Sequence, residues 1–293
     1  MSALQIRDLR IALKTDEGPR PIVNGIDLVL EPGRIHGLAG ESGSGKTMTA
    51  LAVLGLLPTG MTASGSVILG DDTELLGASR RELEAVRGRR VAMVFQDPST
   101  SLHPQIAIGK QLTDHVRHHL GLNKQDARAR AIELIERVRV PDAAGALKKY
   151  PHQFSGGQRQ RIAVAVALAC DPDVLLADEP TTALDVTVQA GVLHLLRQLV
   201  DDTGLSVLLV THDLGVMSAV ADEVTVMRAG VVVESAPREQ LFTSPKHEYT
   251  KTLLAALPGS VLEASPEVLV EELLDADEPV AEPEAPADRE DER

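Results

Sequence analysis

Residues 40–47 read Gly-Glu-Ser-Gly-Ser-Gly-Lys-Thr, which fits the pattern G-x-x-x-x-G-K-[ST] of a phosphate-binding loop. An apolar run at 34–39 precedes them and predicts a buried strand, and the run at 49–57 that follows predicts a helix. The glycines let the loop turn tightly with its N–H groups facing inward, and the helix directs the positive end of its dipole at the same place. We therefore expect a phosphate site formed by Gly40, Glu41, Ser42, Gly43, Ser44, Gly45, Lys46 and Thr47. Lys46 is expected to reach the outer phosphates, and Thr47 to offer its hydroxyl to Mg²⁺.

A second apolar run, at 174–177, ends in two adjacent acids, Asp178 and Glu179. Ligands of open α/β sheets bind beyond the carboxyl ends of the strands, so both side chains are expected beside the phosphate loop. We expect Asp178 to hold Mg²⁺ through water and Glu179 to polarise an attacking water molecule. An acidic strand end that is merely exposed is the alternative interpretation, and the phosphate loop in the same chain argues against it.

Further apolar runs predict buried strands with helices between several of them. This alternation favours an α/β fold with a mainly parallel sheet covered on both faces. Besides the two runs above, the predicted strands are residues 91–95, 206–210 and 223–227. The first thirty residues instead predict antiparallel strands at 22–23 and 26–30 around Asn24-Gly25, which residues 66–69 could join.

Strand signals disappear between about residues 97 and 155, which predicts a helical insertion. Residues 125–138 show one apolar face opposed by charged residues, as an amphipathic helix does. That face consists of Ala127, Ala131, Leu134, Ile135 and Val138.

The charge of the chain is concentrated at one end. Its 43 acidic and 29 basic residues give a formal net charge of −14, and residues 261–293 hold thirteen of the acidic and two of the basic ones. Residues 1–260 are therefore nearly neutral, which argues against nucleic-acid binding through phosphate neutralisation. The acidic segment buries too little apolar area to offset its ordering entropy, so we expect disorder there, with a short helix at 268–274 as the alternative.

The composition excludes further classes of protein. Three Phe, two Tyr and no Trp argue against a platform that stacks bases. Cys170 is the single cysteine, which excludes an internal disulfide and a cysteine-based metal site and favours a small buried apolar role. The first ten residues are charged, and the longest apolar stretch, 162–170, is far short of the ~18 residues that span a bilayer. We expect a soluble chain in a reducing compartment.

Residues 154–161 read Phe-Ser-Gly-Gly-Gln-Arg-Gln-Arg and open a helix rich in Ala and Val. The glycine pair behind Ser155 predicts a second helix start that binds an anion, capped by that serine. The stretch resembles the signature motif of the ATPases of ABC transporters. The resemblance implies contact with the γ-phosphate of an ATP held by a second subunit, made by Ser155, Gly156, Gly157 and Gln158.

Three further motifs of that family follow. Gln96, after the strand at 91–95, resembles the Q-loop glutamine, which touches Mg²⁺ or water and senses the membrane subunit. Ala183-Leu184-Asp185 resembles the D-loop, which implies a dimer contact for Asp185. His212 resembles the switch histidine, which orients the water and the γ-phosphate. A lone histidine at a strand end is more often structural, but the other motifs favour the catalytic role.

The resemblance covers residues 3 to about 257, and within the family the chain is most similar to the peptide/nickel importer ATPases. The residues that indicate this group are Phe-Gln-Asp-Pro-Ser-Thr-Ser-Leu-His-Pro at 95–104 and His247-Glu-Tyr249-Thr250 before Leu253-Leu254. That group commonly continues into a cysteine-rich segment. No cysteine follows Cys170 here, which excludes an iron–sulfur site.

The resemblance implies a P-loop NTPase fold of the ABC type. Its parts would be a mainly parallel core sheet, an N-terminal antiparallel β subdomain and a helical subdomain at about 97–160. We expect the ATPase domain at 1–243, a C-terminal extension at 244–260 and the acidic tail at 261–293.

The resemblance also implies a function, the ATP-binding subunit of an ABC importer. ATP and Mg²⁺ would be its ligands, with Glu179, His212 and Gln96 in catalytic roles and with Mg²⁺ held by Thr47, Gln96 and Asp178. Hydrolysis would drive uptake of a peptide-like or nickel/metal-chelate solute at the cytoplasmic face of the cell membrane. The implied partners are a second ATP-binding subunit, identical or sibling, a transmembrane permease docked on the helical insertion and, indirectly, an external solute-binding protein. An exporter subunit and a soluble ABC ATPase without a transport role are the alternatives.

Three lesser features complete the expectations. No aromatic residue precedes Phe95, and Leu13 stands near the place where the family stacks adenine on an aromatic side chain, so we expect weak discrimination between bases. A histidine cluster is expected on a solvated helix face rather than around a metal: His115, His118 and His119. The basic run at 87–90 is expected to cover a surface turn.

Overall fold

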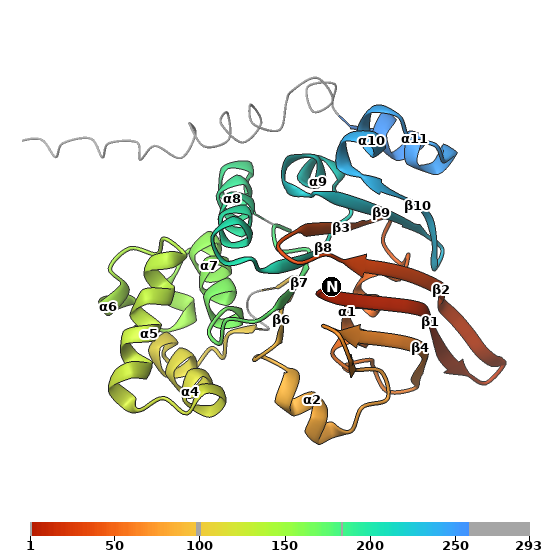
Figure 1. The fold of residues 1–293 in the computed structure, drawn as a ribbon. Helices are drawn as coiled ribbons and strands as arrows, with labels where there is room; N and C mark the ends of the chain where they lie inside the picture. Colours follow the sequence, from red (N-terminus) through yellow and green to blue (C-terminus); the bar gives the residue numbers. More distant parts are fainter. Residues whose placement is uncertain (1, 98–100, 183, 258–293) are drawn as a thin grey trace, which may run out of the picture.

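Two β-sheets form the frame of the described part of the chain (Figure 1). The computed structural model describes residues 2–97, 101–182 and 184–257. The strands of the larger sheet are β3 (Ile35–Ala39), β6 (Val91–Val94), β7 (Val174–Asp178), β8 (Ser206–Val210), β9 (Glu223–Arg228) and β10 (Val231–Pro237). Their order is β10-β9-β3-β8-β7-β6, and every neighbouring pair is parallel except β9 and β10. The predicted mainly parallel core sheet is confirmed.

Helices and the second sheet cover the two faces of this larger sheet. The helices are α1 (Lys46–Val53), α2 (Arg80–Val86), α4 (Ile108–Leu120), α5 (Lys124–Arg137), α6 (Ala143–Ala146), α7 (Gly156–Ala167), α8 (Val186–Thr203), α9 (Leu214–Val220), α10 (Arg238–Thr243) and α11 (Glu248–Ala255), with a 3₁₀ turn at Pro151–Gln153. Leu175 and Ala177 of β7 pack into a cluster with α7, α8 and α9, whereas Leu176 packs into one with α1 and the smaller sheet. Successive side chains of a strand point to opposite faces, so both faces of β7 are buried.

The smaller sheet is antiparallel throughout, which confirms the predicted N-terminal β subdomain. Its order is β2-β1-β4-β5, with β1 (Leu4–Thr15), β2 (Gly18–Leu30), β4 (Met61–Leu69) and β5 (Thr73–Glu74). The structure corrects one detail, because β2 runs unbroken through Asn24-Gly25. The register slips there, from Leu9 opposite Ile26 to Arg10 opposite Asn24, and Gly25 has a φ of 73°. The pair therefore forms a β-bulge rather than a break between two strands.

The helix behind the phosphate loop also differs from its prediction. It was expected at 49–57, but α1 begins at Lys46 and ends at Val53. Gly45, with a φ of 104°, turns the chain directly into the helix, and Gly55, with a φ of 59°, lies just past its end. The loop and the helix are therefore continuous, as an anion site at a helix start requires.

The predicted helical insertion is present as α4, α5 and α6, with no strand in the described chain between residues 101 and 155. In Figure 1 these helices lie on one side of the larger sheet and the antiparallel sheet lies on the other. The apolar face predicted for 125–138 is buried: Ala127, Ala131, Leu134 and Ile135 on α5 and Val138 at its C-cap.

The remaining predictions concern Cys170, the acidic tail and the D-loop. Cys170 is buried as predicted, and burial raises the pKa of its thiol to about 11. The acidic tail, the alternative helix at 268–274 and Ala183 of the D-loop lie outside the described residues. Among the described helices, none combines the length and the apolar character needed to cross a membrane.

Candidate active site

Four strand ends bring the predicted catalytic residues to one edge of the larger sheet. Because β3, β6, β7 and β8 are parallel, their carboxyl ends meet at this edge. The phosphate loop follows β3, and Asp178 ends β7. Gln96 and His212 lie two residues beyond the ends of β6 and β8.

The shape of the phosphate loop depends on two glycines. Gly40 has a φ of 144°, and a Cβ there would lie 2.2 Å from the carbonyl oxygen of Met227. Gly45 has a φ of 104°, and its Cβ would lie 2.8 Å from Val23 Cγ2. The hydroxyl of Ser44 is buried and has no hydrogen-bond partner among the described residues. A buried polar atom of this kind fits a loop whose remaining partner is an oxyanion.

Lys46 lies across this loop and is only 5% exposed. Its Nζ donates to the carbonyl oxygens of Gly40 at 2.7 Å and Glu41 at 3.0 Å. Burial lowers the pKa of Lys46, and the carboxylates of Glu179 and Asp178 oppose that shift. A polyanion in the loop would offset the same cost of burying the ammonium group.

Thr47 and Asp178 form the second contact of the site. Thr47 Oγ1 donates to Asp178 Oδ1 at 3.1 Å. Burial raises the pKa of Asp178, the neighbouring Glu179 charge adds to the rise, and the Thr47 hydrogen bond opposes it. A hydroxyl and a carboxylate side by side form a donor set that suits Mg²⁺ when phosphate oxygens and water complete its shell.

Three side chains hold the carboxylate of Glu179. Oε1 lies 2.9 Å from His212 Nδ1, and Oε2 accepts from Thr182 Oγ1 at 2.7 Å and from Gln96 Nε2 at 3.3 Å. Burial acts to raise the pKa of Glu179, but the His212 and Thr182 hydrogen bonds outweigh it and hold the pKa below its ordinary value. The carboxylate is therefore ionised at neutral pH and able to accept a proton.

The backbone of Glu179 is also constrained. It has a φ of 46°, which non-glycine residues seldom adopt, and its N–H donates to the Val210 carbonyl at 2.8 Å. Strained backbone of this kind is concentrated at functional sites, where the surrounding structure over-determines it. The site thus brings together six predicted residues, which are Lys46, Thr47, Gln96, Asp178, Glu179 and His212.

The predicted signature residues build a separate cluster. Ser155 Oγ accepts the N–H of Gln158 at 3.3 Å, and the Gln158 side chain accepts the N–H of Ser155 at 3.2 Å, so the two form a capping box on α7. Asp185 caps α8, where its Oδ1 accepts the N–H of Val188 at 2.9 Å. Within the described ranges, no hydrogen bond or ion pair joins these residues to the phosphate loop.

The starts of α7 and α8 pack directly on each other. A Cβ at Gly157 would lie 2.4 Å from Val188 Cγ1, whereas one at Gly156 would find its nearest atom, Leu184 Cδ2, at 3.9 Å. Glycine at 157 is therefore required by packing within this chain, and glycine at 156 is not.

Two side chains of the site were not predicted. Thr182 bonds to Glu179, and the signal that could have found it is a hydroxyl residue three positions after that acid. Tyr249 accepts the backbone N–H of Glu41 at 3.3 Å. The sequence singled out His247-Glu-Tyr249-Thr250 only as a mark of a group, and no local signal connects it to the loop.

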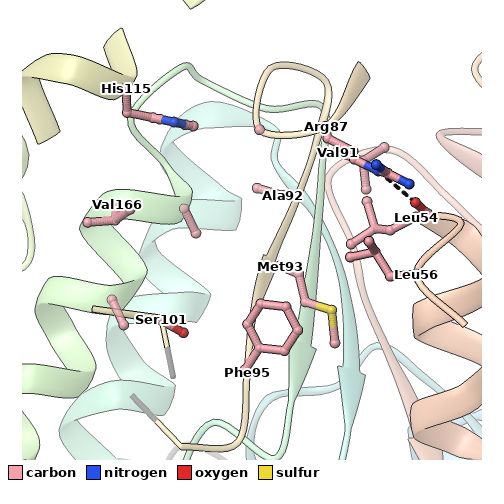
Figure 2. A pocket seen from close by; sticks show the side chains of 13 residues that line it. Leu54, Leu56, Arg87, Val91, Ala92, Met93, Phe95, Ser101, His115 and Val166 are labelled. Carbon is pink, nitrogen blue, oxygen red and sulfur yellow. Dashed lines mark hydrogen bonds between the residues drawn. The ribbon is translucent and has the colours of Figure 1, made fainter. Parts of the chain in front are cut away.

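A pocket of about 270 Å³ is lined by Phe95, the residue directly before Gln96 (Figure 2). Figure 2 shows Met93 of β6 and Phe95 just after β6 between Leu56, beyond α1, and Val166 of α7. Most of its walls are apolar, and they join the core sheet to the helical subdomain.

One prediction about the walls of this pocket is corrected, and another is extended. His115 does not lie on a solvated face, because it lines the pocket and is half-buried, and burial lowers its pKa. Arg87 does more than cover a turn, since its Nε donates to the Leu54 carbonyl at 2.8 Å and its Nη2 to the Gly55 carbonyl at 3.1 Å. The histidine thus joins α4 to the pocket, and the arginine joins the end of α2 to the end of α1.

Fold and site together define a P-loop ATPase, because a phosphate loop and a held carboxylate share the carboxyl edge of a parallel sheet. The sequence model of the ABC transporter family matches residues 23–182. The chain therefore belongs to the ABC transporter family, and it is an ATP-binding, ATP-hydrolysing member of it.

Individual relatives agree with this assignment. A putative peptide import ATP-binding protein of Brucella abortus is 48% identical over 257 residues, which cover 87% of this chain and 77% of the relative. The oligopeptide transport ATP-binding protein AppD of Bacillus subtilis is 44% identical over 257 residues, which cover 87% and 78%. A dimeric ATP-binding cassette in a post-hydrolysis state with ADP and Pi has a TM-score of 0.71 at 26% identity, covering 80% of this chain and 98% of that one.

The packing between α7 and α8 predicts opposite effects for the two signature glycines. Gly157→Ala should lower the free energy of unfolding by about 1–3 kcal/mol, because the new methyl group overlaps the stiff Val188 side chain. Gly156→Ala should leave stability unchanged or raise it, because alanine favours a helix and has room there. Urea unfolding measures both. Val188→Ala should restore much of the stability lost in Gly157→Ala, and equal stabilities of the two glycine variants would contradict the packing.

Proposed function

We propose that this chain is the ATP-hydrolysing subunit of an importer that takes up a peptide-like solute through a membrane permease. The observation that carries the proposal is the Glu179 carboxylate, held by His212, Thr182 and Gln96 at the edge where the phosphate loop begins. Relatives that are 42–48% identical over most of the chain are named peptide import, oligopeptide transport or dipeptide transport ATP-binding proteins. Their names supply the class of solute.

Mg²⁺ fits the residues present beside the phosphate loop. Thr47 would supply its hydroxyl, Asp178 its carboxylate through water, and Gln96 its amide oxygen. The bound ion would neutralise charge that develops on the phosphoryl oxygens.

Different residues of the chain then have different roles in hydrolysis. The N–H groups of residues 40–47 and the ammonium group of Lys46 orient the phosphates. Glu179 takes a proton from the attacking water at its carboxylate, and His212 keeps that carboxylate in place. Gln96 bonds the same carboxylate and directly follows Phe95 of the pocket wall, so it would connect the pocket to the water-activating group.

A second ATP-binding subunit would complete the site. Ser155–Gln158 and Asp185 are separate from this chain's own loop, so we assign them to an ATP held by the partner, an identical copy or a sibling. Two helix starts around one triphosphate would stabilise its charge from both sides. The similar cassette noted above is a dimer.

The pocket of Figure 2 is the proposed docking site of the permease at the cytoplasmic face of the membrane. It has apolar walls, it lies between the core sheet and the helical subdomain, and Phe95 in its wall precedes Gln96 directly. Movement of a docked permease segment against Phe95 would therefore be transmitted to Glu179 through Gln96. An external solute-binding protein would act on the permease, not on this chain.

Glu179→Gln should bind ATP with unchanged affinity and lower kcat by roughly 10²–10⁴-fold, because the amide cannot accept the proton of water. Steady-state phosphate release and equilibrium binding of a fluorescent ATP analogue measure the two effects. Glu84→Gln on α2 is the matched control, since Glu84 is exposed and forms an ion pair with Arg80 within the same helix. Undiminished hydrolysis by Glu179→Gln would remove Glu179 from its assigned role.

The transport assay that tests the proposal uses vesicles that contain the chain and its copurifying permease subunits. Labelled oligopeptide is supplied on the side of the membrane that lacks the ATPase. It should accumulate in the compartment that holds the ATPase and ATP, and Glu179→Gln should abolish this movement. Movement away from that compartment would establish the exporter alternative, and copurification without any membrane protein would favour the soluble one.

Leu56→Glu should weaken binding of the permease subunits about tenfold or more, because a charge replaces an apolar side chain in the docking pocket. Leu56 is 41% exposed in the isolated chain, so folding should tolerate the change. Leu120→Glu, at the end of α4 and outside the pocket, is a matched control at 37% exposure. Quantitative pull-down measures the binding, and equal losses for the two variants would place the docking site elsewhere.

ATP and GTP should be hydrolysed with kcat/KM values within a few-fold of each other, because Leu13 offers an aliphatic contact instead of an aromatic stack. Leu13 of β1 is paired with Arg20 of β2. Two residues further along β2, the carbonyl oxygen of Ile22 lies beside Gly45, so Leu13 is near the phosphate loop. Leu13→Tyr should lower the KM for ATP by about two- to tenfold, since stacking of aromatic rings contributes ~0.5–1.5 kcal/mol. A strong preference of the unaltered chain for ATP would contradict this account.

A further inference from the structure

The C-terminal extension contacts the phosphate loop through Tyr249. This residue is in the first turn of α11, is 5% exposed, and accepts the backbone N–H of Glu41 at 3.3 Å. The same peptide unit presents its carbonyl oxygen, that of Gly40, to Lys46 Nζ at 2.7 Å. A peptide unit is planar, so a hydroxyl that holds its N–H also sets the direction of its C=O. Tyr249 and Lys46 therefore act on opposite ends of one rigid group.

The ring of Tyr249 is held by the strand that lies behind the loop. The guanidinium carbon of Arg228, at the end of β9, lies 4.7 Å from the ring centroid. The carbonyl oxygen of Met227, the residue before Arg228, packs against Gly40. Gly230 donates its N–H to the Ser44 carbonyl at 3.2 Å. The turn from β9 to β10 thus supports both the loop and the tyrosine.

The start of α11 is fixed by contacts that do not involve the nucleotide site. Glu234 of β10 accepts the N–H groups of Lys246 at 2.7 Å and His247 at 3.0 Å. His247 Nδ1 in turn accepts the N–H of Tyr249 at 3.1 Å and caps the helix. The position of the tyrosine is therefore set by β10 before any ligand binds.

We propose that Tyr249 is a positioning residue for the phosphate loop, holding the Gly40–Glu41 peptide in the orientation that places Lys46 for the outer phosphates of ATP. The inference rests on the proposed ATP hydrolysis and adds the C-terminal extension to the nucleotide site. Burial raises the pKa of Tyr249, and the nearby Glu41 carboxylate adds to that rise, so the hydroxyl remains neutral. Loss of the hydroxyl releases the peptide without removing any group that touches the nucleotide.

Tyr249→Phe tests this proposal, because the ring and its Arg228 contact remain while the hydroxyl is removed. We expect the Kd and the KM for ATP to rise about three- to tenfold, the loss of one hydrogen bond, with kcat changed less than twofold. Hydrogen exchange of the segment 40–47 should be faster in the ligand-free variant, and the thermal unfolding temperature should be unchanged. Tyr150→Phe is the matched control, since Tyr150 is 41% exposed and is remote from these contacts.

Two results would overturn the proposal. One is an unchanged Kd together with unchanged exchange at 40–47, and the other is a fall in kcat with no change in Kd or KM. Failure of the unaltered chain to bind ATP would instead overturn the proposed function. The exchange measurement separates the two failures, because it needs neither nucleotide nor turnover.

Discussion

The rest of the site depends on opposite charges that are buried together at one edge of the larger sheet, the ammonium group of Lys46 and the carboxylate of Asp178, beside the partly buried carboxylate of Glu179. Lys46 and Asp178 are each 5% exposed, and an unpartnered buried charge costs several kcal/mol. Each charge has its own partners, which are backbone carbonyls for Lys46, a hydroxyl for Asp178 and three donors for Glu179. The parallel strands bring all of these groups to the same edge, so the chemistry of the site depends on the topology of the sheet.

The conformation of the phosphate loop depends on residues packed against it as well as on its own glycines. Met227 and Val23 leave no room for side chains at Gly40 and Gly45, and Gly230 bonds the loop backbone. Val23 comes from β2, near the start of the chain, whereas Met227 and Gly230 come from β9 and the turn that follows it, far along the chain. The conformation of residues 40–47 therefore depends on packing from distant parts of the chain. A substitution at Val23, Met227 or Gly230 should first change the affinity for phosphate.

The sequence predicted the parts of the site whose chemistry is local. Lys46, Thr47, Asp178 and Glu179 follow apolar runs at fixed spacing, so strand ends could be assigned without knowing the fold. The Glu41–Tyr249 contact spans 208 residues and depends on how α11 docks, which no periodicity encodes. The Asn24-Gly25 pair misled for a related reason. Its residue types suit a turn and a β-bulge equally, and only the pairing of β1 with β2 decides between them.

In the proposed dimer, the separation of the signature from the phosphate loop accounts for two anion-binding helix starts in one chain. Gly157 lets α7 approach Val188 of α8, so the signature and Asp185 are held in one rigid unit. The capping box of Ser155 and Gln158 satisfies the first turn of α7 without any ligand. This surface is therefore formed without a ligand, and in the proposed dimer it would cost little to order when it meets the partner's nucleotide. In the proposed dimer, a subunit that contacts Asp185 would also set the orientation of the signature, so dimer formation would itself complete the site.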